Sequence, residues 1–312
     1  MRIIFFGTPE LAVPSLAALA EAHDVCAVVS QPDRPSGRGK ALLPPPVKQW
    51  AVEHGIPVVQ PVKLNDGAFE AWLREQRPEV CALTAYGRIL KQPILDVAPH
   101  GILNMHPSLL PLYRGPSPIQ SAVLNGETET GITIMRLSLD MDAGDVLLQE
   151  RVPIDPEDTG ATLSDRLATL GGDKFREAVD RLAHGEATFM AQEHERATYC
   201  RLIEKRDGQI HWARPAREIH NLVRGAQPWP MAHCMLRGQV VRILKTHVLS
   251  ETVGTAAPGT VTASAKDRLF VATGDAAIAI LTIQAPGKRA LPISEFLRGC
   301  AIHVGERFES IP

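Results

Sequence analysis

Residues 1–30 read MRIIFFGTPELAVPSLAALAEAHDVCAVVS, and their pattern decides the fold class. An apolar run over 2–6 ends at Gly7-Thr8-Pro9, apolar residues then recur at helical spacing, and a second apolar run covers Val25–Val29. Strand, helix and strand in this order predict a βαβ unit, which implies a parallel sheet. The loop lacks the second and third glycines of the dinucleotide fingerprint, so it does not predict a nucleotide site.

The alternation of strand and helix continues through the next part of the chain. Apolar runs at 57–59, 80–83 and 101–103 predict further strands, with a helical pattern between the first two. Open parallel sheets bind their ligands at the carboxyl ends of the strands. We therefore expect Tyr86-Gly87-Arg88 and Asn104–Pro111 to flank one crevice.

The sequence changes character after residue 188. Strands are predicted at 131–137 and 146–152 and an amphipathic helix at 162–184, followed by polar sequence of weak periodicity. Short β-rich runs then recur between Gly, Pro and Asp residues, which is typical of a small barrel; they lie at 240–244, 259–262, 269–272 and 277–284. We predict a doubly wound, mostly parallel α/β domain over 1–188, a linker over 189–206 and a small β-barrel domain over 207–312.

Length and composition agree with two domains in a cytoplasmic protein. The chain has 312 residues, 45% of them hydrophobic and 22% charged, which is ordinary for globular domains. Five scattered cysteines without metal-ligand spacing indicate reduced thiols, and no metal site is predicted. No apolar stretch has transmembrane length. We expect no membrane association and a monomer.

Charge is distributed unevenly along the chain. Residues 201–312 carry 15 Lys and Arg against 9 Asp and Glu, whereas residues 1–200 carry 18 against 26. A basic C-terminal third on an acidic body favours a polyanionic partner. The alternative is a surface that is uneven without functional meaning.

Asn104 and His106 are the first candidates for catalysis. They follow a short apolar run and lie two residues apart, so both side chains should leave the strand on one face. An amide and an imidazole side by side suit acyl transfer. The alternative is a hydrogen-bonded core histidine beside a turn asparagine.

Residues 31–48 form a long loop for an α/β unit. The loop carries four cations among glycines and prolines, and such a mobile basic arm can reach phosphates; the cations are Arg34, Arg38, Lys40 and Lys48. A plain solvated loop is the alternative.

The turn at residues 140–145 holds three carboxylates, Asp140, Asp142 and Asp145. Its spacing lacks the glycine and the terminal glutamate of a calcium loop. We therefore interpret it as a turn with one functional carboxylate.

Several of these motifs together resemble the formyl-tetrahydrofolate-dependent formyltransferases. The resemblance runs over essentially the full length, and it is carried by Gly7-Thr8-Pro9, residues 31–40, Asn104 with His106, Ser108-Leu109-Leu110-Pro111, Tyr113-Arg114-Gly115, Asp142-Ala143-Gly144-Asp145, Gln227-Pro228-Trp229-Pro230, Ala272-Thr273-Gly274-Asp275 and Gly287-Lys288.

The resemblance implies a Rossmann-like catalytic domain and a C-terminal barrel of the oligonucleotide-binding type. It implies formyl transfer from 10-formyltetrahydrofolate to the methionine amino group of initiator methionyl-tRNA. It also assigns roles to residues of this chain. Asn104, His106 and Asp142 would be catalytic, Tyr86 and Ser108, Leu109, Leu110 and Pro111 would line the folate site, and Arg34, Arg38, Lys40 and Lys48 would contact the tRNA.

Formyl transfer gives these residue types a chemical role. The tetrahedral intermediate develops an oxyanion, to which the Asn104 amide and a protonated His106 can donate hydrogen bonds. Asp142 near His106 would favour the imidazolium and relay the proton that leaves the attacking amine. No nucleophilic side chain is needed, because the amine attacks the formamide directly.

Two departures from the family pattern concern the tRNA contacts. Leu112 stands where many relatives have a basic residue, and Ala41 replaces a second lysine beside Lys40. Two rival functions stay open at this point. One is a formyltransferase acting on a small amine, such as an amino sugar nucleotide or glycinamide ribonucleotide; the other is a folate-binding or RNA-binding protein without catalysis.

Overall fold

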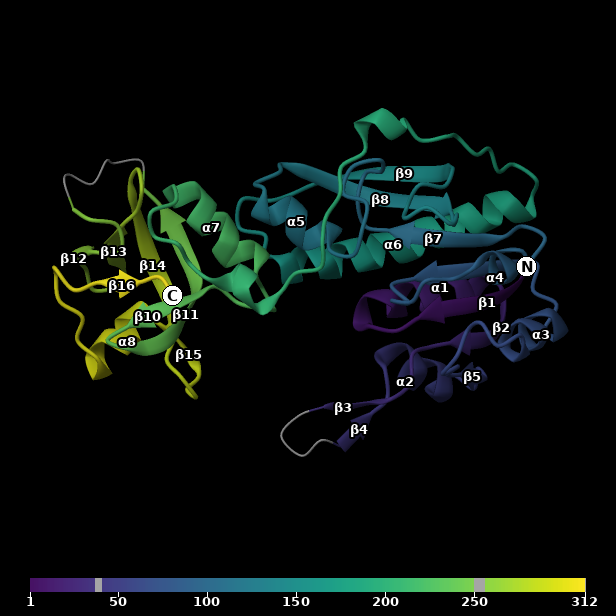
Figure 1. Ribbon diagram of the computed structural model, residues 1–312, viewed down its shortest axis with the longest axis horizontal. Coiled ribbons are helices and arrows are strands. Elements are labelled where there is room, and N and C mark those ends of the chain that lie inside the picture. Colours follow the sequence, from purple (N-terminus) through teal and green to yellow (C-terminus); the bar gives the residue numbers. More distant parts are fainter. Residues whose placement is uncertain (37–40, 250–255, 312) are drawn as a thin grey trace. The chain divides into compact units, whose positions relative to one another are not determined.

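The computed structural model describes residues 1–36, 41–249 and 256–311 (Figure 1). Contacts between Cα atoms divide the chain into two compact units. Unit 1 contains residues 1–118, 129–153 and 164–201, and unit 2 contains residues 119–128, 154–163 and 202–312. Two short pieces that precede residue 164 therefore belong to the C-terminal unit.

Unit 1 is built on a seven-stranded sheet with the order β5-β2-β1-β6-β7-β8-β9. The first five strands in this order pair in parallel, and β8 and β9 extend the sheet antiparallel. The strands are β1 (Arg2–Gly7), β2 (Asp24–Val29), β5 (Val58–Val59), β6 (Val80–Thr84), β7 (Ile102–His106), β8 (Glu129–Arg136) and β9 (Val146–Pro153). The predicted mostly parallel sheet is confirmed.

Helices cover both faces of this sheet, which explains why the central strands β6 and β7 are buried along their whole length. Ile4 and Phe6 of β1 pack into a core with residues of α3 and α4. On the opposite face Gly171 and Gly172 of α6 approach Met105 of β7 and Pro14 of α1. The helical segments in this part of the chain are η1 (Glu10–Ala12), α1 (Val13–Ala22), α2 (Pro46–Glu53), α3 (Ala68–Glu75), α4 (Gln92–Leu95), α6 (Gly160–Ala183) and η2 (His194–Arg196).

The long basic loop has more regular structure than the sequence indicated. Its flanks form two short antiparallel strands, β3 (Arg34–Ser36) and β4 (Ala41–Leu43), which pair with each other. Residues 37–40, which include Arg38 and Lys40, lie outside the described residues. The sequence did not predict these two strands, because their pairing joins residues on opposite sides of the loop.

Unit 2 contains an antiparallel sheet with the order β12-β13-β14-β11-β10-β16, and β15 pairs with β14. Backbone hydrogen bonds also join its two edges, from Val261 N to Glu306 O (2.8 Å) and from Phe308 N to Gly259 O (2.8 Å). The strands are β10 (His233–Leu236), β11 (Gln239–Val248), β12 (Val261–Ser264), β13 (Leu269–Ala272), β14 (Ala277–Gln284), β15 (Ala290–Pro292) and β16 (Phe308–Glu309).

The apolar side chains of the second sheet meet in one core. Trp212, Ile278 and Phe308 are buried there, together with Ile219 and Val223 of the helix α7. The helical segments that accompany this sheet are α5 (Pro118–Leu124), η3 (Lys205–Gly208), α7 (Ala216–Gly225) and α8 (Ile293–Gly299). Over the described residues, no helix is both long enough and apolar enough to cross a membrane.

Candidate active site

Asn104 and His106 are the third and the last residue of β7, which covers Ile102–His106. The strand is longer than the predicted run 101–103, because Asn104 pairs with Leu83 of β6 and with Met135 of β8. Asn104 is 6% exposed and His106 is 5% exposed. Within the described residues the Asn104 amide makes no hydrogen bond, so its donors are available to a bound molecule.

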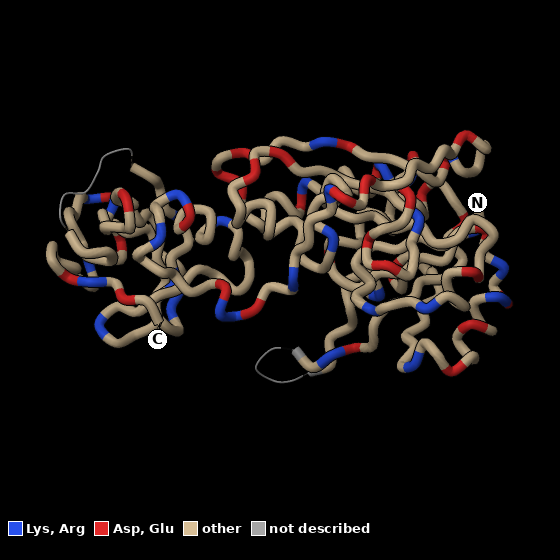
Figure 2. The backbone as a smooth tube through the Cα atoms, turned by 45° about the horizontal axis from the view of Figure 1, so that its top comes forward, with Lys and Arg blue, Asp and Glu red and all other residues tan. Residues whose placement is uncertain are grey.

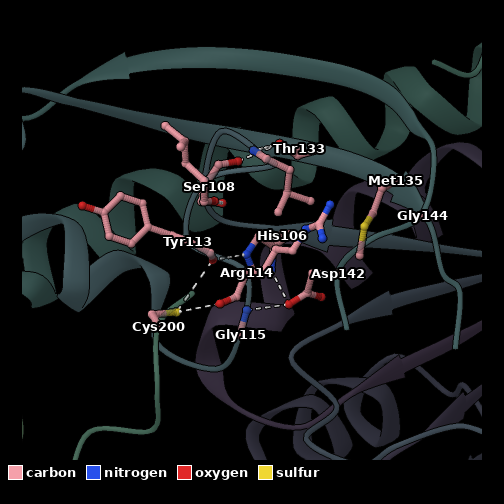
Figure 3. A network of polar contacts seen from close by, with 12 residues as sticks. His106, Ser108, Tyr113, Arg114, Gly115, Thr133, Met135, Asp142, Gly144 and Cys200 are labelled. Atoms are coloured by element: carbon pink, nitrogen blue, oxygen red, sulfur yellow. Dashed lines mark hydrogen bonds and ion pairs between the residues drawn. The ribbon is translucent and has the colours of Figure 1, made fainter. Parts of the chain in front are cut away.

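The imidazole of His106 is held at both ring nitrogens (Figure 3). Nε2 lies 2.9 Å from the backbone oxygen of Tyr113, and Nδ1 lies 3.7 Å from Oδ2 of Asp142. The carbonyl of Tyr113 accepts from the Nε2–H group, so the ring is oriented with Nδ1 toward the carboxylate. A histidine from a strand and an aspartate 36 positions later are thus brought into contact.

Asp142 occupies the connection between β8 and β9. Its Oδ2 also accepts a 2.8 Å hydrogen bond from the backbone N–H of Gly115. Its backbone is left-handed, with φ of 49°, a conformation that aspartate tolerates better than most residues. Asp140 and Asp145 are exposed and take part in the turn through their backbone oxygens, which accept from Ala143 N and Arg136 N.

The loop of residues 108–111 is held by its own polar groups. Ser108 is 1% exposed, and its hydroxyl donates to the backbone oxygen of Leu112 (2.6 Å). Thr133 of β8 donates to Ser108 O (2.7 Å) and accepts from Leu110 N (3.1 Å). Ser108 and Leu110 therefore stabilise the loop from inside. Leu109 and Pro111 are partly exposed.

The ring of Tyr86 is directed away from solvent. It is completely buried and packs edge-on against Phe6, with ring centroids 5.5 Å apart. Burial raises the pKa of its hydroxyl. Its backbone oxygen accepts from Thr8 Oγ1 (3.0 Å) and Gln31 Nε2 (2.8 Å). The ring is part of the core, and the folate contact of Tyr86 stays a prediction.

The cations of the basic arm differ in their surroundings. Lys48 is turned inward, with Nζ 2.8 Å from both carboxylate oxygens of Asp33 and 2.8 Å from Gln60 Oε1. Hydrogen bonds from Lys48 Nζ and from Gln60 Nε2 hold the pKa of the Asp33 carboxyl below its usual range. Arg34 is exposed and donates to Gln31. Lys48 therefore anchors the base of the arm, whereas Arg34 faces solvent.

Sequence reasoning missed three polar residues of this site. Thr133 and Gln149 hold the 108–111 loop, since Gln149 Nε2 donates to Leu110 O (2.7 Å) and to Thr133 Oγ1 (3.0 Å). Gln192 contacts the Asp142 turn from a segment that the sequence predicted as linker. Of these three residues, the sequence offered a sign only for Thr133, which is a polar residue inside the apolar run 131–137.

Comparisons with known proteins cover both units. A family model described as Formyl transferase matches residues 1–179, and one described as Formyl transferase, C-terminal domain, matches residues 202–301. A methionyl-tRNA formyltransferase from Acetivibrio thermocellus is 43% identical over 307 residues, which are 98% of this chain and 99% of the relative.

Solved structures with the same fold are more distant in sequence. An N-formyltransferase from Helicobacter canadensis, in complex with folinic acid and dTDP-3-aminofucose, has a TM-score of 0.69 at 20% identity and covers 91% of this chain and 98% of its own. HypX from Aquifex aeolicus, in complex with tetrahydrofolic acid, has a TM-score of 0.65 at 19% identity over 95% of this chain. This chain spans about half of HypX, 47% of its length.

Proposed function

The chain belongs to the formyl transferase family, and from this premise we propose that it formylates the α-amino group of methionine on initiator methionyl-tRNA, with 10-formyltetrahydrofolate as the donor. The observation that carries the choice of acceptor is the 43% identity to a methionyl-tRNA formyltransferase over 98% of the chain. That likeness includes the C-terminal unit.

The reaction moves a formyl group from one nitrogen to another. The methionine nitrogen attacks the formyl carbon, the bond from that carbon to N10 of the folate breaks, and N10 gains the proton that the amine loses. The intermediate carries an oxyanion, and one well-placed donor to it is worth about 3 kcal/mol. Catalysis by this chain therefore needs hydrogen-bond donors and a proton acceptor within one crevice.

Asn104, His106 and Asp142 supply these groups in our proposal. The unpaired amide of Asn104 donates to the oxyanion beside His106, since both side chains leave the same face of β7. The Asp142 carboxylate, 3.7 Å from His106 Nδ1, receives the amine proton directly or through the ring. The hydrogen bond from Gly115 N keeps that carboxylate on the histidine side of the turn.

The folate co-substrate suits the residues beside this crevice. Leu109 and Pro111 follow His106 in the sequence and are partly exposed apolar residues. The free amide of Asn104 lies two positions before His106. Ser108 and Leu110 support Leu109 and Pro111 from behind. We place the donor against the outer residues of the 108–111 loop.

The tRNA is recognised by the arm and by unit 2 in this proposal. Unit 2 is a barrel of the oligonucleotide-binding type, supported by the hydrogen bonds that join the edges of its sheet. Figure 2 shows Lys and Arg distributed along this unit, with acidic residues between them. Arg34, Arg38 and Lys40 would contact phosphates. We expect the enzyme to act as a cytoplasmic monomer with domains over 1–188 and 207–312 and a linker over 189–206.

A competition between acceptors tests the proposal. The purified chain is given 10-formyltetrahydrofolate with either methionyl initiator tRNA or an amino sugar nucleotide, and consumption of the formyl donor is followed. We expect rapid transfer to the tRNA and negligible transfer to the sugar. Transfer to the sugar alone would assign the small-amine function. Binding of tRNA without any transfer would identify a non-catalytic binding protein.

A further inference from the structure

A segment that the sequence marks as linker lies against the candidate catalytic loops. We call residues 190–200 the strap. At one end Met190 and Val146 exchange two backbone hydrogen bonds of 2.8 Å. At the other end Arg114 N donates to Thr198 O (2.9 Å) and Cys200 N donates to Arg114 O (2.8 Å). The strap is thus fixed to both the start of β9 and the loop after His106.

Gln192 lies between these two attachments and uses every polar group of its amide. Nε2 donates to the backbone oxygens of Asp142 (2.9 Å) and Gly144 (2.7 Å). Oε1 accepts from Arg114 through Nη2 (2.7 Å) and Nε (3.2 Å). Gln192 is 7% exposed and Arg114 is 3% exposed, so these bonds are shielded from water. A buried amide with all its partners satisfied specifies one arrangement of the groups around it.

The two loops that Gln192 joins are the ones that position the candidate catalytic pair. Tyr113 O orients the His106 ring, and Gly115 N binds the Asp142 carboxylate. Arg114 lies between Tyr113 and Gly115 in the sequence, and its guanidinium donates a hydrogen bond to Gln192 (Figure 3 shows Arg114, Gly115 and Asp142 together). The left-handed backbone of Asp142 needs support from its surroundings, and the Gln192 amide holds the carbonyl of that residue.

We propose that Gln192 is a positioning residue for formyl transfer, which holds Asp142 in the register that places its carboxylate on His106. This inference rests on the proposed function. Only an amide meets the demands of the position, because it must donate twice on one side and accept on the other. A glutamate at position 192 would keep the contact with Arg114. Its carboxylate, however, would lie against the carbonyl oxygens of Asp142 and Gly144 and could donate no hydrogen bond to them.

The test uses the full chain with the substitutions Gln192→Glu and Gln192→Met. Displacement of a reacting group by about 1 Å can cost on the order of 100-fold in rate. We expect kcat for formylation of methionyl-tRNA to fall about 10- to 100-fold, with both KM values changed by less than about threefold. The matched control is Gln76→Glu, which makes the same change at the end of α3 in unit 1 and should leave kcat unaltered.

The decisive readout is the effect of the same substitutions in the Asp142→Ala protein. If Gln192 acts through Asp142, they cause no further loss of kcat in that background. A kcat near that of the wild type in the single variants, or an undiminished loss in the Asp142→Ala background, overturns the proposal. If Gln192→Glu does not fold, the kcat of Gln192→Met decides between these outcomes. A wild-type chain that transfers no formyl group refutes the proposed function instead.

Discussion

At the scale of single residues, we expect removal of the Asn104 amide or the His106 ring to affect rate and not folding. Asn104→Ala should lower kcat about 100- to 1000-fold, because it removes a donor to the oxyanion. His106→Ala should lower kcat about 100- to 10,000-fold, because it removes the ring that Asp142 contacts and through which the amine proton passes. The Asn104 amide has no partner within the described residues, so its loss leaves no protein group unsatisfied. Single-turnover formylation and thermal unfolding measured together check this prediction. Wild-type rates in either folded variant would contradict the assignment.

Gly115 is the second residue-scale prediction. Its φ is +116°, and a Cβ there would lie 2.2 Å from the backbone oxygen of Cys200. Gly115→Ala should therefore displace the N–H that binds Asp142, lowering both kcat and stability, the latter by about 1–3 kcal/mol. The control is Gly185→Ala, which has φ of +72° but no atom within 4 Å of the added Cβ. Urea unfolding that shows equal losses for the two variants would exclude the predicted clash.

At the scale of elements, the base of the β3–β4 arm is a hydrogen-bonded anchor. Asp33, Lys48 and Gln60 are joined by four bonds of 2.7 to 2.8 Å. If Lys48 positions the arm, Lys48→Met and Asp33→Asn should raise the KM for tRNA to a similar extent. If Lys48 instead binds a phosphate, only Lys48→Met should weaken binding, with the salt slope reduced by about one.

Substitution of the cations in the arm should affect tRNA binding differently from substitution of the anchor residues Lys48 and Asp33, because it should reduce the salt dependence of binding. Arg34 is exposed, and Arg38 is a sequence-based prediction outside the described residues. Loss of one phosphate contact by Arg38→Ala should reduce the salt slope of tRNA binding by about one. Binding titrations at several salt concentrations separate this effect from that of Lys48 or Asp33 substitutions. An unchanged slope would show that Arg38 makes no phosphate contact.

The packing of α7 on β11 makes stability depend on pH. His220 Nδ1 lies 3.0 Å from Thr246 Oγ1, and burial, with Arg224 and Arg217 nearby, lowers the pKa of His220 to about 4. Glu157 opposes this shift. The unfolded chain takes up a proton near pH 6.5 that the folded chain accepts only near pH 4. Stability should therefore fall by about 3 kcal/mol between these values.

The variant His220→Gln isolates this contribution. It cannot titrate, so its free energy of unfolding should decline less between pH 6.5 and pH 4 than that of the wild type. Urea unfolding at both pH values measures the difference. Parallel declines for the two proteins would show that His220 is not responsible.

At the scale of the whole molecule, unit 2 includes two pieces that are distant in sequence, 119–128 and 154–163. Arg224, 9% exposed, donates from Nη1 to Asp158 O (2.8 Å) and from Nη2 to Asn221 Oδ1 (2.8 Å). Arg224→Met should destabilise the chain by about 1–3 kcal/mol, because buried acceptors lose their donors. The control is Arg242→Met, whose cation is exposed and should have little effect. Equal unfolding free energies for the two variants would contradict the prediction.

Much of the architecture followed from periodicity. The alternation over residues 1–106 predicted the parallel sheet, since apolar runs between helices have few other solutions. The periodicity of apolar residues did not predict the short elements. β10, β15, β16 and α8 were missed because each has only two to seven residues, and their assignment depends on partners elsewhere in the chain. The division into units has the same origin, because no local signal links residues 154–163 to α7.

The sequence by itself determined the fold class and the pair Asn104 and His106, because strand alternation is local and places residues two apart on one face. The family resemblance already singled out Asp142 among the three aspartates of its turn, whereas only the tertiary structure decided that Lys48 is an anchor and that the ring of Tyr86 is core. It also brought Gln192 from the linker onto the Asp142 turn. These outcomes depend on contacts between residues far apart in the sequence, such as Lys48 with Asp33 and Arg114 with Gln192, and local periodicity carries no information about such pairs.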